Sequence, residues 1–267
     1  MINTIVIGVG GRMGKTITQM VIEDKELNLV GATEIKSSPL IGKSIKEGTG
    51  IDIENIKITH DLESIIDECD VIIDFTQPES SLITLKLAVE YKKGVVIGTT
   101  AFTKEQDNEA KKLALKTRTV MAPNMSVGVN LVFKIIKDIT KIIGNDYDIE
   151  IIEAHHRGKK DSPSGTALNI ARIIADELNR DLSKVAVHER KGIIGKRSKE
   201  EIGIQVIRAG DIVGEHTILF GGIGERIEIT HKATSRENFA KGAIKAVHFI
   251  VNKKNGLYNM EDVLGIK

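Results

Sequence analysis

The sequence predicts an α/β protein that combines a doubly wound parallel sheet with a second, α+β domain containing an open mixed sheet. Three observations lead to this prediction. Short β-branched runs alternate with helical stretches through the first half of the chain, and this alternation is typical of parallel sheets. A glycine-rich turn follows the first of these runs. After about Asn124 the pattern changes to a long apolar helix and several further strands.

The first half contains five expected strands separated by helices. The strands are expected at 4–7, 27–30, 71–73, 95–97 and 119–121. Helical spacing connects Leu82, Leu85 and Val89, and Thr103 with Gln106 forms a capping box that begins another helix. A polar turn follows each strand, and doubly wound sheets bind ligands at the carboxyl ends of their strands.

The second half is expected to hold an apolar helix, a mixed sheet and a returning helix. The helix runs through Val132 to Ile143, a second helix is expected at 166–178, and a charged loop at 188–201. The strands are expected at 147–154, 202–208, 213–220 and 226–232. The last helix, from Phe239 to Ile250, is expected to return to the first domain. This gives one domain of residues 1–125 and 236–267, and another of residues 126–235.

Composition limits the class of function. The 267 residues carry 38 Lys and Arg against 37 Asp and Glu, a formal net charge of +1, which argues against a nucleic-acid partner and an anionic membrane partner. Cys69 is the single cysteine and excludes an intramolecular disulfide. No apolar run approaches the roughly 18 residues of a membrane span, and no signal peptide is visible. A cytoplasmic protein is expected.

The glycine-rich turn predicts a Rossmann-like dinucleotide site. Gly8, Gly11 and Gly14 follow the first strand and begin a helix. Glycines permit a tight turn and close approach to a pyrophosphate, and the helix N-terminus offers N–H groups to it. Glu34 ends the second strand about 20 residues later, where an acid accepts hydrogen bonds from a ribose. The coincidence of these features favours dinucleotide binding over a purely structural turn.

The segment 153–166 is the densest in chemical groups. A strand ends in two histidines, followed by cations and a Pro-Ser-Gly-Thr turn into a helix. Ser164, Gly165 and Thr166 would offer hydroxyl and N–H groups to a carboxylate at the helix start. Lys159 and one histidine could supply positive charge or protons near neutral pH. The sequence therefore predicts a site for an anionic substrate.

Other interpretations of this segment are weaker. His155 and His156 are adjacent on a strand and point to opposite faces, and no third ligand is placed by spacing, so no metal is expected. Lys160 alone is as well explained by a solvated loop, and the Ser-Gly-Thr turn alone by a helix cap. A Ser-His-Asp hydrolase is disfavoured because no Gly-x-Ser-x-Gly elbow is present.

Over essentially its whole length the chain resembles the 4-hydroxy-tetrahydrodipicolinate reductase family, formerly called dihydrodipicolinate reductases. The most specific motif is Glu-Ala-His-His-Arg at 153–157 with the Pro-Ser-Gly-Thr-Ala-Leu run at 163–168. The other matching motifs lie at 8–14, 74–76 with 78–79, 98–100, 122–130, 208–210, 228–231 and 235–236.

The resemblance implies a role for each matching residue. His155 would be the catalytic proton donor or acceptor, and Lys159 the proton donor. His156, Gly165 and Thr166 would bind the dicarboxylate substrate beside Ser164. The residues that would line the nicotinamide cofactor are Gly8, Val9, Gly10, Gly11, Arg12, Met13, Glu34, Gly98, Thr99, Thr100, Ala122, Pro123, Asn124 and Met125. Residues 126–235 would then form the substrate and oligomerisation domain.

In this family, hydride from NADH or NADPH reduces the hydroxylated ring with loss of water, in lysine and diaminopimelate biosynthesis. Members are usually homotetramers joined through the second sheet, and sites on separate domains imply closure before hydride transfer. Two departures matter. Ile35 stands where many members carry Arg, with Lys36 one residue on, and Gly158 replaces a common histidine. Use of both cofactors is therefore expected, with NADH at least as effective as NADPH.

Two alternatives remain open. One is a different nicotinamide oxidoreductase of similar build, acting on a substrate such as aspartate or homoserine; the segment 155–166 argues against it because it suits a dicarboxylate ring. The other is a non-catalytic dinucleotide sensor, which the presence of both His155 and Lys159 disfavours.

Overall fold

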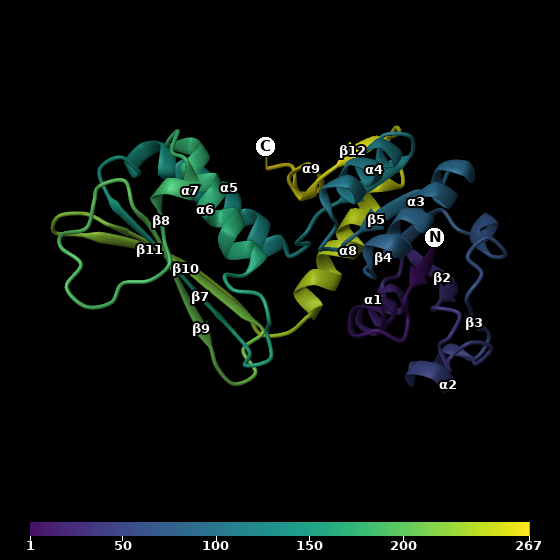
Figure 1. The fold of residues 1–267 in the computed structure, drawn as a ribbon. Helices are drawn as coiled ribbons and strands as arrows, with labels where there is room; N and C mark the ends of the chain where they lie inside the picture. Colours follow the sequence, from purple (N-terminus) through teal and green to yellow (C-terminus); the bar gives the residue numbers. More distant parts are fainter. Residues whose placement is uncertain (267) are drawn as a thin grey trace. The chain divides into compact units, whose positions relative to one another are not determined.

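The computed structural model describes residues 1–266, which form two compact units (Figure 1). The first unit comprises Met1–Val127 and the segment from Arg236 onward, and the second comprises Gly128–Ser235. The first break in the chain lies two residues after the expected boundary, and the second lies at the expected position.

A seven-stranded sheet of order β12-β6-β5-β4-β1-β2-β3 forms the centre of the first unit, and every strand pair in it is parallel. Its strands are β1 (Ile2–Ile7), β2 (Leu27–Thr33), β3 (Ile58–Thr59), β4 (Val71–Asp74), β5 (Gly94–Ile97), β6 (Arg118–Met121) and β12 (Gly256–Tyr258). The predicted parallel sheet is confirmed. The sequence did not indicate β3 and β12, because strands of two or three residues are too short to show alternation.

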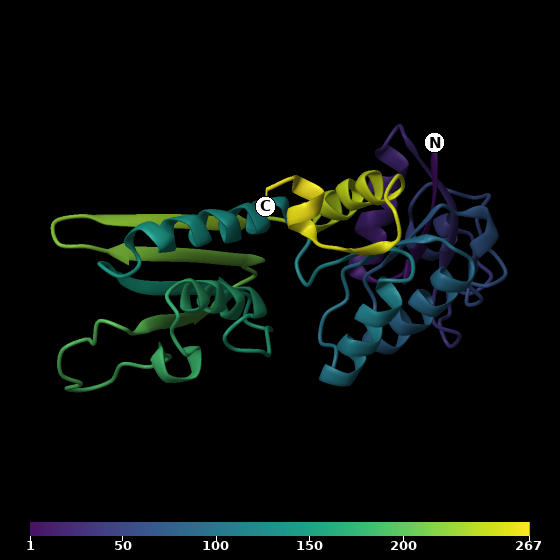
Figure 2. The same ribbon diagram turned by 90° about the horizontal axis from the view of Figure 1, so that it is seen from above.

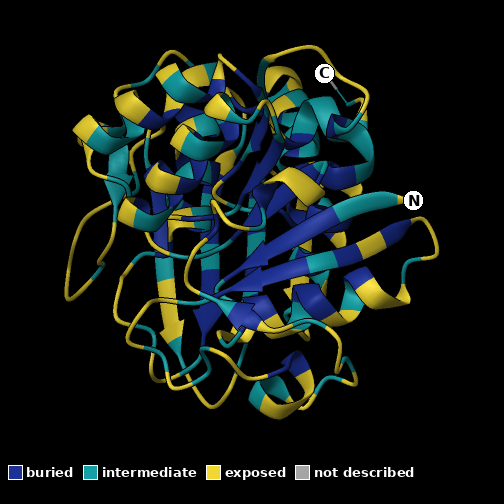
Figure 3. Ribbon diagram, turned by 90° about the vertical axis from the view of Figure 1, so that its right-hand side faces the viewer, coloured by how far each residue is buried: buried dark blue, intermediate teal, exposed yellow. Residues whose placement is uncertain are grey.

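Helices cover both faces of this sheet. They are α1 (Arg12–Glu23), α2 (Ile45–Thr49), α3 (Pro78–Glu90), α4 (Lys104–Ala114), α8 (Glu237–Ile250) and α9 (Met260–Leu264). One apolar cluster joins α1 and α8 to one face through residues such as Ile17 and Val247. A second cluster joins α3 and α4 to the other face through Leu85 and Ala110. The sheet is therefore doubly wound, and its strands are largely buried (Figure 3).

The second unit is a five-stranded mixed sheet of order β11-β10-β7-β9-β8. Its elements are α5 (Val127–Ile143), β7 (Asp148–His155), α6 (Gly165–Glu177), α7 (Leu182–Val185), β8 (Ala186–Val187), β9 (Ile202–Arg208), β10 (Gly214–Gly221) and β11 (Arg226–Ala233). The pairs β7–β9 and β8–β9 are parallel, and β10 is antiparallel to both β7 and β11. Helices α5 and α6 pack against one face through Ile136 and Ile170 (Figure 2).

The covered face of this second sheet changes character along β7. Ile149 and Ile151 are fully buried in the apolar cluster. Because side chains alternate along a strand, the next residues on the same face are Glu153 and His155. The hydrophobic face therefore ends in ionisable groups where β7 ends.

None of the helices in the described range 1–266 is long and apolar enough to cross a lipid bilayer.

Candidate functional site

The glycine turn of the first unit connects β1 to α1 at the carboxyl end of the sheet. Gly8 has a φ of +72°, and the N–H groups of Gly8 and Val9 donate to the Thr33 carbonyl at 2.8 and 3.1 Å. A Cβ on Gly14 would lie 2.0 Å from the Gly8 carbonyl oxygen. The turn therefore requires glycine at both positions for its own packing, in addition to any ligand.

Glu34 lies beside this turn at the end of β2. Its carboxylate accepts hydrogen bonds from the Gly10 N–H at 2.7 Å and the Ile35 N–H at 3.2 Å. A cleft of about 900 Å³ opens here, which we call the glycine cleft. Among the predicted cofactor residues, those that line it are Gly8, Gly11, Arg12, Met13 and Glu34.

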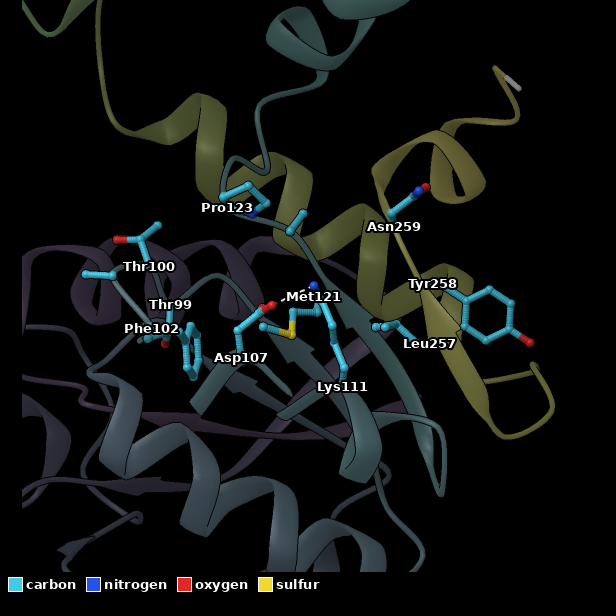
Figure 4. Close-up of a pocket in the computed structure, with 12 residues that line it drawn as sticks. Thr99, Thr100, Phe102, Asp107, Lys111, Met121, Pro123, Leu257, Tyr258 and Asn259 are labelled. Carbon is cyan, nitrogen blue, oxygen red and sulfur yellow. Dashed lines mark hydrogen bonds and ion pairs between the residues drawn. The ribbon is translucent and has the colours of Figure 1, made fainter. Parts of the chain in front are cut away.

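A second hollow of about 590 Å³, which we call the threonine pocket, lies where β5, β6 and β12 end (Figure 4). Four predicted cofactor residues line it, namely Thr99, Thr100, Ala122 and Pro123. Leu257, Tyr258 and Asn259 form one wall, which the sequence did not indicate because β12 is so short.

The remaining predicted cofactor residues line neither hollow. Gly98 lies under Phe75, since a Cβ there would come within 2.4 Å of that ring. The side chains of Val9 and Met125 are 0% and 1% exposed and belong to the apolar core. Gly10 contacts Glu34, and Asn124 accepts from the Ser126 N–H at 2.9 Å.

In the second unit His155 ends β7 and binds a buried carboxylate. Its Nδ1 lies 2.5 Å from Glu153 Oε2, and Glu153 is 0% exposed. Arg208 at the end of β9 donates to both Glu153 oxygens at 2.9 Å, and the Ser164 N–H donates to Oε1 at 2.9 Å. Although burial opposes ionisation, Arg208, His155 and Ser164 together hold the pKa of the Glu153 carboxyl below its usual value.

Ser164 connects this cluster to helix α6. Its Oγ accepts from the Ala167 N–H at 3.1 Å, which caps the helix, and lies 3.1 Å from His216 Nε2. The rings of His155 and His216 meet edge to face with centroids 5.3 Å apart. Burial lowers the pKa of both imidazoles, and Glu153 opposes the change at His155.

The other predicted substrate residues lie in the loop and turn that follow β7. Lys159 Nζ forms an ion pair with Asp161 Oδ1 at 2.8 Å, and its charge contributes to the lowered pKa of His155. His156 is half-buried and Gly165 is exposed at the start of α6. Thr166 follows in the first turn of that helix. No group of three His, Cys, Asp or Glu side chains within residues 1–266 is arranged to hold a metal ion.

Sequence reasoning missed the partners of His155. Glu153 stood in the motif without a role, and Arg208 and His216 lie more than fifty residues further along the chain. Sheet register places Arg208 opposite His155 and His216 opposite Glu153. The alternation along β7 did place Glu153 on the same face as His155, and that was the available signal.

His216 makes stability depend on pH. Burial lowers its pKa from 6.5 to about 4, with His155 adding to the effect. The unfolded chain therefore takes up a proton at higher pH than the folded chain, and stability is lost as pH falls from 6.5 towards 4. For His216→Gln we expect the drop in unfolding free energy between pH 7 and pH 5 to be about 2 kcal/mol smaller than in the wild type. Urea unfolding at both pH values measures this, and equal drops would contradict it.

The fold and the two sites define a class: oxidoreductases that join a Rossmann-like unit to an α+β unit carrying an acid–base cluster. Comparison with known proteins specifies the family. Models of the N- and C-terminal parts of dihydrodipicolinate reductase match residues 2–125 and 128–264. The chain is 49% identical to the 4-hydroxy-tetrahydrodipicolinate reductase of Syntrophus aciditrophicus and 47% identical to that of Geotalea daltonii, with 100% of both chains covered in each case.

Solved structures agree with this. A dipicolinate-bound dihydrodipicolinate reductase from Paenisporosarcina superposes with a TM-score of 0.75 at 26% identity, covering 98% of each chain. An amine dehydrogenase from Mycobacterium smegmatis, at 12% identity and a TM-score of 0.59 over 98% of this chain and 95% of that one, shares the fold alone. The chain belongs to the dihydrodipicolinate reductase family, as the sequence motifs indicated.

Proposed function

We propose that the chain reduces 4-hydroxy-tetrahydrodipicolinate to tetrahydrodipicolinate, with hydride from NADH or NADPH and loss of the hydroxyl as water, in lysine and diaminopimelate biosynthesis. One observation carries the proposal within this family. A buried carboxylate–imidazole pair, Glu153 and His155, is hydrogen-bonded to the capped turn that begins α6.

The turn and its cations suit a dicarboxylate. Gly165 leaves open space at the start of α6, with no atom within 4 Å of where a Cβ would lie. One substrate carboxylate would accept hydrogen bonds from the Gly165 and Thr166 N–H groups, where the helix dipole favours negative charge. Lys159, with His156 beside it, would face the substrate charge in place of its present partner Asp161.

Proton transfer would fall to His155 and Lys159. Reduction of the unsaturated ring leaves an electron-rich system that must be protonated, which a group titrating near neutral pH can serve. Burial lowers the pKa of His155 in the free protein, and a bound dianion would raise it again by favouring the imidazolium. Lys159 remains as a second proton donor.

The glycine cleft fits a nicotinamide dinucleotide. No side chain caps the N-terminus of α1 at Gly11, so the N–H groups of its first turn remain suited to a pyrophosphate. A Cβ on Gly14 would clash with the Gly8 carbonyl oxygen and disrupt this turn. The Glu34 carboxylate lies where it would accept a hydrogen bond from a ribose hydroxyl. The dinucleotide supplies the hydride when bound. Because these residues lie in the first unit and His155 in the second, closure before hydride transfer stays part of the proposal.

We predict that NADH supports turnover at least as well as NADPH. Glu34 and Ile35 line the glycine cleft without offering a cation, and a carboxylate repels a 2′-phosphate. Arg12 and Lys36 also line the cleft, and their cations would supply partial compensation. The ratio of kcat/KM values measures the preference, and Ile35→Arg should shift it towards NADPH. A large NADPH preference in the wild type would contradict the prediction.

We predict that Gly165→Ala weakens substrate binding without loss of stability. The new methyl group meets no atom within 4 Å in the free protein, and alanine is favoured over glycine in a helix. It would occupy the space proposed for a substrate carboxylate, so KM should rise about tenfold or more while Tm is unchanged or higher. An unchanged KM would place the carboxylate elsewhere.

Turnover tests the proposed function directly. Freshly prepared 4-hydroxy-tetrahydrodipicolinate is added to the protein with NADH or NADPH, and the loss of nicotinamide absorbance is followed. Tight dinucleotide binding without turnover would favour a sensor. Turnover with aspartate or homoserine but not with 4-hydroxy-tetrahydrodipicolinate would favour a different oxidoreductase.

We propose that the protein is a homotetramer joined through the second sheet. The face opposite α5 and α6 carries partly exposed apolar side chains, among them Ile207 at 47% exposure and the half-buried Leu219. Apolar sheet faces of this kind are commonly covered by another subunit. Sedimentation equilibrium distinguishes a tetramer from a monomer, and Leu219→Glu should lower the mass observed.

A further inference from the structure

Glu153 is a fully buried carboxylate paired with His155, and the proton transfer proposed above gives it no role of its own. It lies at the centre of a cluster drawn from four parts of the second unit: its own strand β7, β9, β10 and the turn before α6. Among the described residues, the ionisable groups that face the His155–Glu153 pair are Arg208 on β9, His216 on β10, Lys159 in the loop after β7 and, through Lys159 and Arg208, Asp161.

Both oxygens of Glu153 are fully engaged. Oε1 accepts from the Ser164 N–H and from Arg208 Nη2, each at 2.9 Å, and Oε2 accepts from Arg208 Nη1 at 2.9 Å. The fourth contact is His155 Nδ1, at 2.5 Å from Oε2. An ionised carboxylate has no proton to donate. The ring proton in this contact must therefore reside on Nδ1, which leaves Nε2 with a free lone pair in the neutral imidazole.

Nε2 faces a position where the fold keeps side chains away. A Cβ built on Gly214, at the start of β10, would lie 3.0 Å from His155 Nε2. The φ of Gly214 does not require glycine, so the lack of a side chain here serves spacing rather than backbone conformation. Nδ1 is thus held by Glu153, and Nε2, which lies beside Gly214, is the ring nitrogen that carries the lone pair.

We propose that Glu153 is a positioning residue for His155: clamped by Arg208 and the Ser164 N–H, it holds the imidazole with its proton on Nδ1 and makes Nε2 the atom that exchanges a proton in the reaction. The same carboxylate ties the imidazole to the turn at Ser164, so the proton-transfer group and the proposed carboxylate cradle keep a fixed separation. The catalytic part of this inference rests on the proposed function; the ring orientation does not.

The tautomer can be measured without substrate. Nitrogen chemical shifts of His155, from ¹⁵N-labelled protein at pH 7.5 and assigned by comparison with His155→Ala, distinguish Nδ1–H from Nε2–H. We expect Nδ1–H alone in the wild type and a mixture of tautomers in Glu153→Gln. A wild-type ring protonated on Nε2 would overturn the proposal whatever the variants do.

A double-mutant cycle separates positioning from structural damage. Glu153→Gln should lower kcat by at least about tenfold with little change in KM, yet change the residual rate of His155→Ala by less than about twofold. Equal losses in both backgrounds would show that Glu153 does not act through His155. If Glu153→Gln does not fold, Arg208→Lys replaces it in the cycle, since lysine keeps the charge but loses the two-point clamp.

Glu150→Gln provides the matched control. Glu150 lies on β7 as well, and its two oxygens bind Arg190 at 2.7 and 2.9 Å, but its side chain points to the opposite face. The Glu150→Gln variant should lose a comparable ion pair, while the tautomer of His155 and the value of kcat stay as in the wild type. If no nicotinamide turnover is found, the proposed function fails while the tautomer measurement still decides whether Glu153 orients His155.

Discussion

Replacing His155 by alanine is expected to lower kcat at least about 100-fold, the range typical of losing a positioned acid–base group, while nicotinamide affinity is unchanged. His155 is 9% exposed, with Nδ1 bound to Glu153 and Nε2 open, so its removal takes away the proton-transfer atom and leaves the turn at Ser164 in place. The glycine cleft belongs to the other unit. Steady-state assays that follow NADH absorbance measure kcat, and titration of the protein with NADH, followed by fluorescence, measures dinucleotide affinity.

Lys159→Ala is the companion variant. In the wild type the Lys159 ammonium forms an ion pair with Asp161 rather than with Glu153. Removing it should also reduce turnover severely, while the Glu153–His155 contact survives. Lys159→Arg would keep the charge but hold its proton too firmly to donate it, and should restore KM more than kcat. Full activity in either alanine variant would remove that residue from the proposed mechanism.

The pH dependence follows from the same cluster. Burial lowers the pKa of His155, and Glu153 opposes this. The imidazole of the free protein is therefore mostly neutral at pH 7, and the limb of kcat/KM that reports His155 should have its midpoint below pH 6.5. A bound dicarboxylate raises the pKa, so the corresponding limb of kcat should lie at higher pH. In Glu153→Gln both limbs should move to lower pH, because the charge that favours the imidazolium is gone.

Local patterns predicted the parallel sheet well because each of its longer strands is a compact apolar run. Observed β4 and β5 each extend the expected strand by one residue. The candidate site could be proposed from the sequence where its groups are close together, as in the segment 153–166. Arg208 and His216 reach the site only through pairing of β9 and β10 with β7, and pairing between strands fifty residues apart leaves no local periodicity to detect.

The glycine turn shows a different limit. A glycine motif indicates that side chains are excluded but not what excludes them. At Gly14 the Gly8 carbonyl, which belongs to the fold, excludes a side chain. At Gly165 no neighbouring group of the free protein comes within 4 Å of an added Cβ. Val9 and Met125 were predicted as cofactor residues from motif membership, and their side chains are instead buried in the core. Contact with a dinucleotide at those two positions would use the backbone.

Gly14→Ala is expected to destabilise the first unit by about 2–4 kcal/mol and to weaken dinucleotide binding at least about tenfold. The added Cβ would lie 2.0 Å from the Gly8 carbonyl oxygen, 2.8 Å from its carbon and 2.9 Å from Val9 Cα. These are backbone atoms held by the hydrogen bonds of Gly8 and Val9 to Thr33, so relief requires α1 to move away from β1. Urea unfolding and NADH titration measure the two effects.

Gly11→Ala separates the fold's requirement from the ligand's. It lies in the same turn with a φ of −70°, and its Cβ would approach only the Gly8 carbonyl oxygen, at 3.2 Å. A shift of a few tenths of an ångström relieves that contact, so stability should fall by less than about 1 kcal/mol. The methyl group would still face the path of a pyrophosphate at the N-terminus of α1, and NADH affinity should fall. If Gly11→Ala binds NADH as the wild type does, the pyrophosphate does not lie against this turn, and the dinucleotide must be placed elsewhere along the carboxyl edge of the sheet.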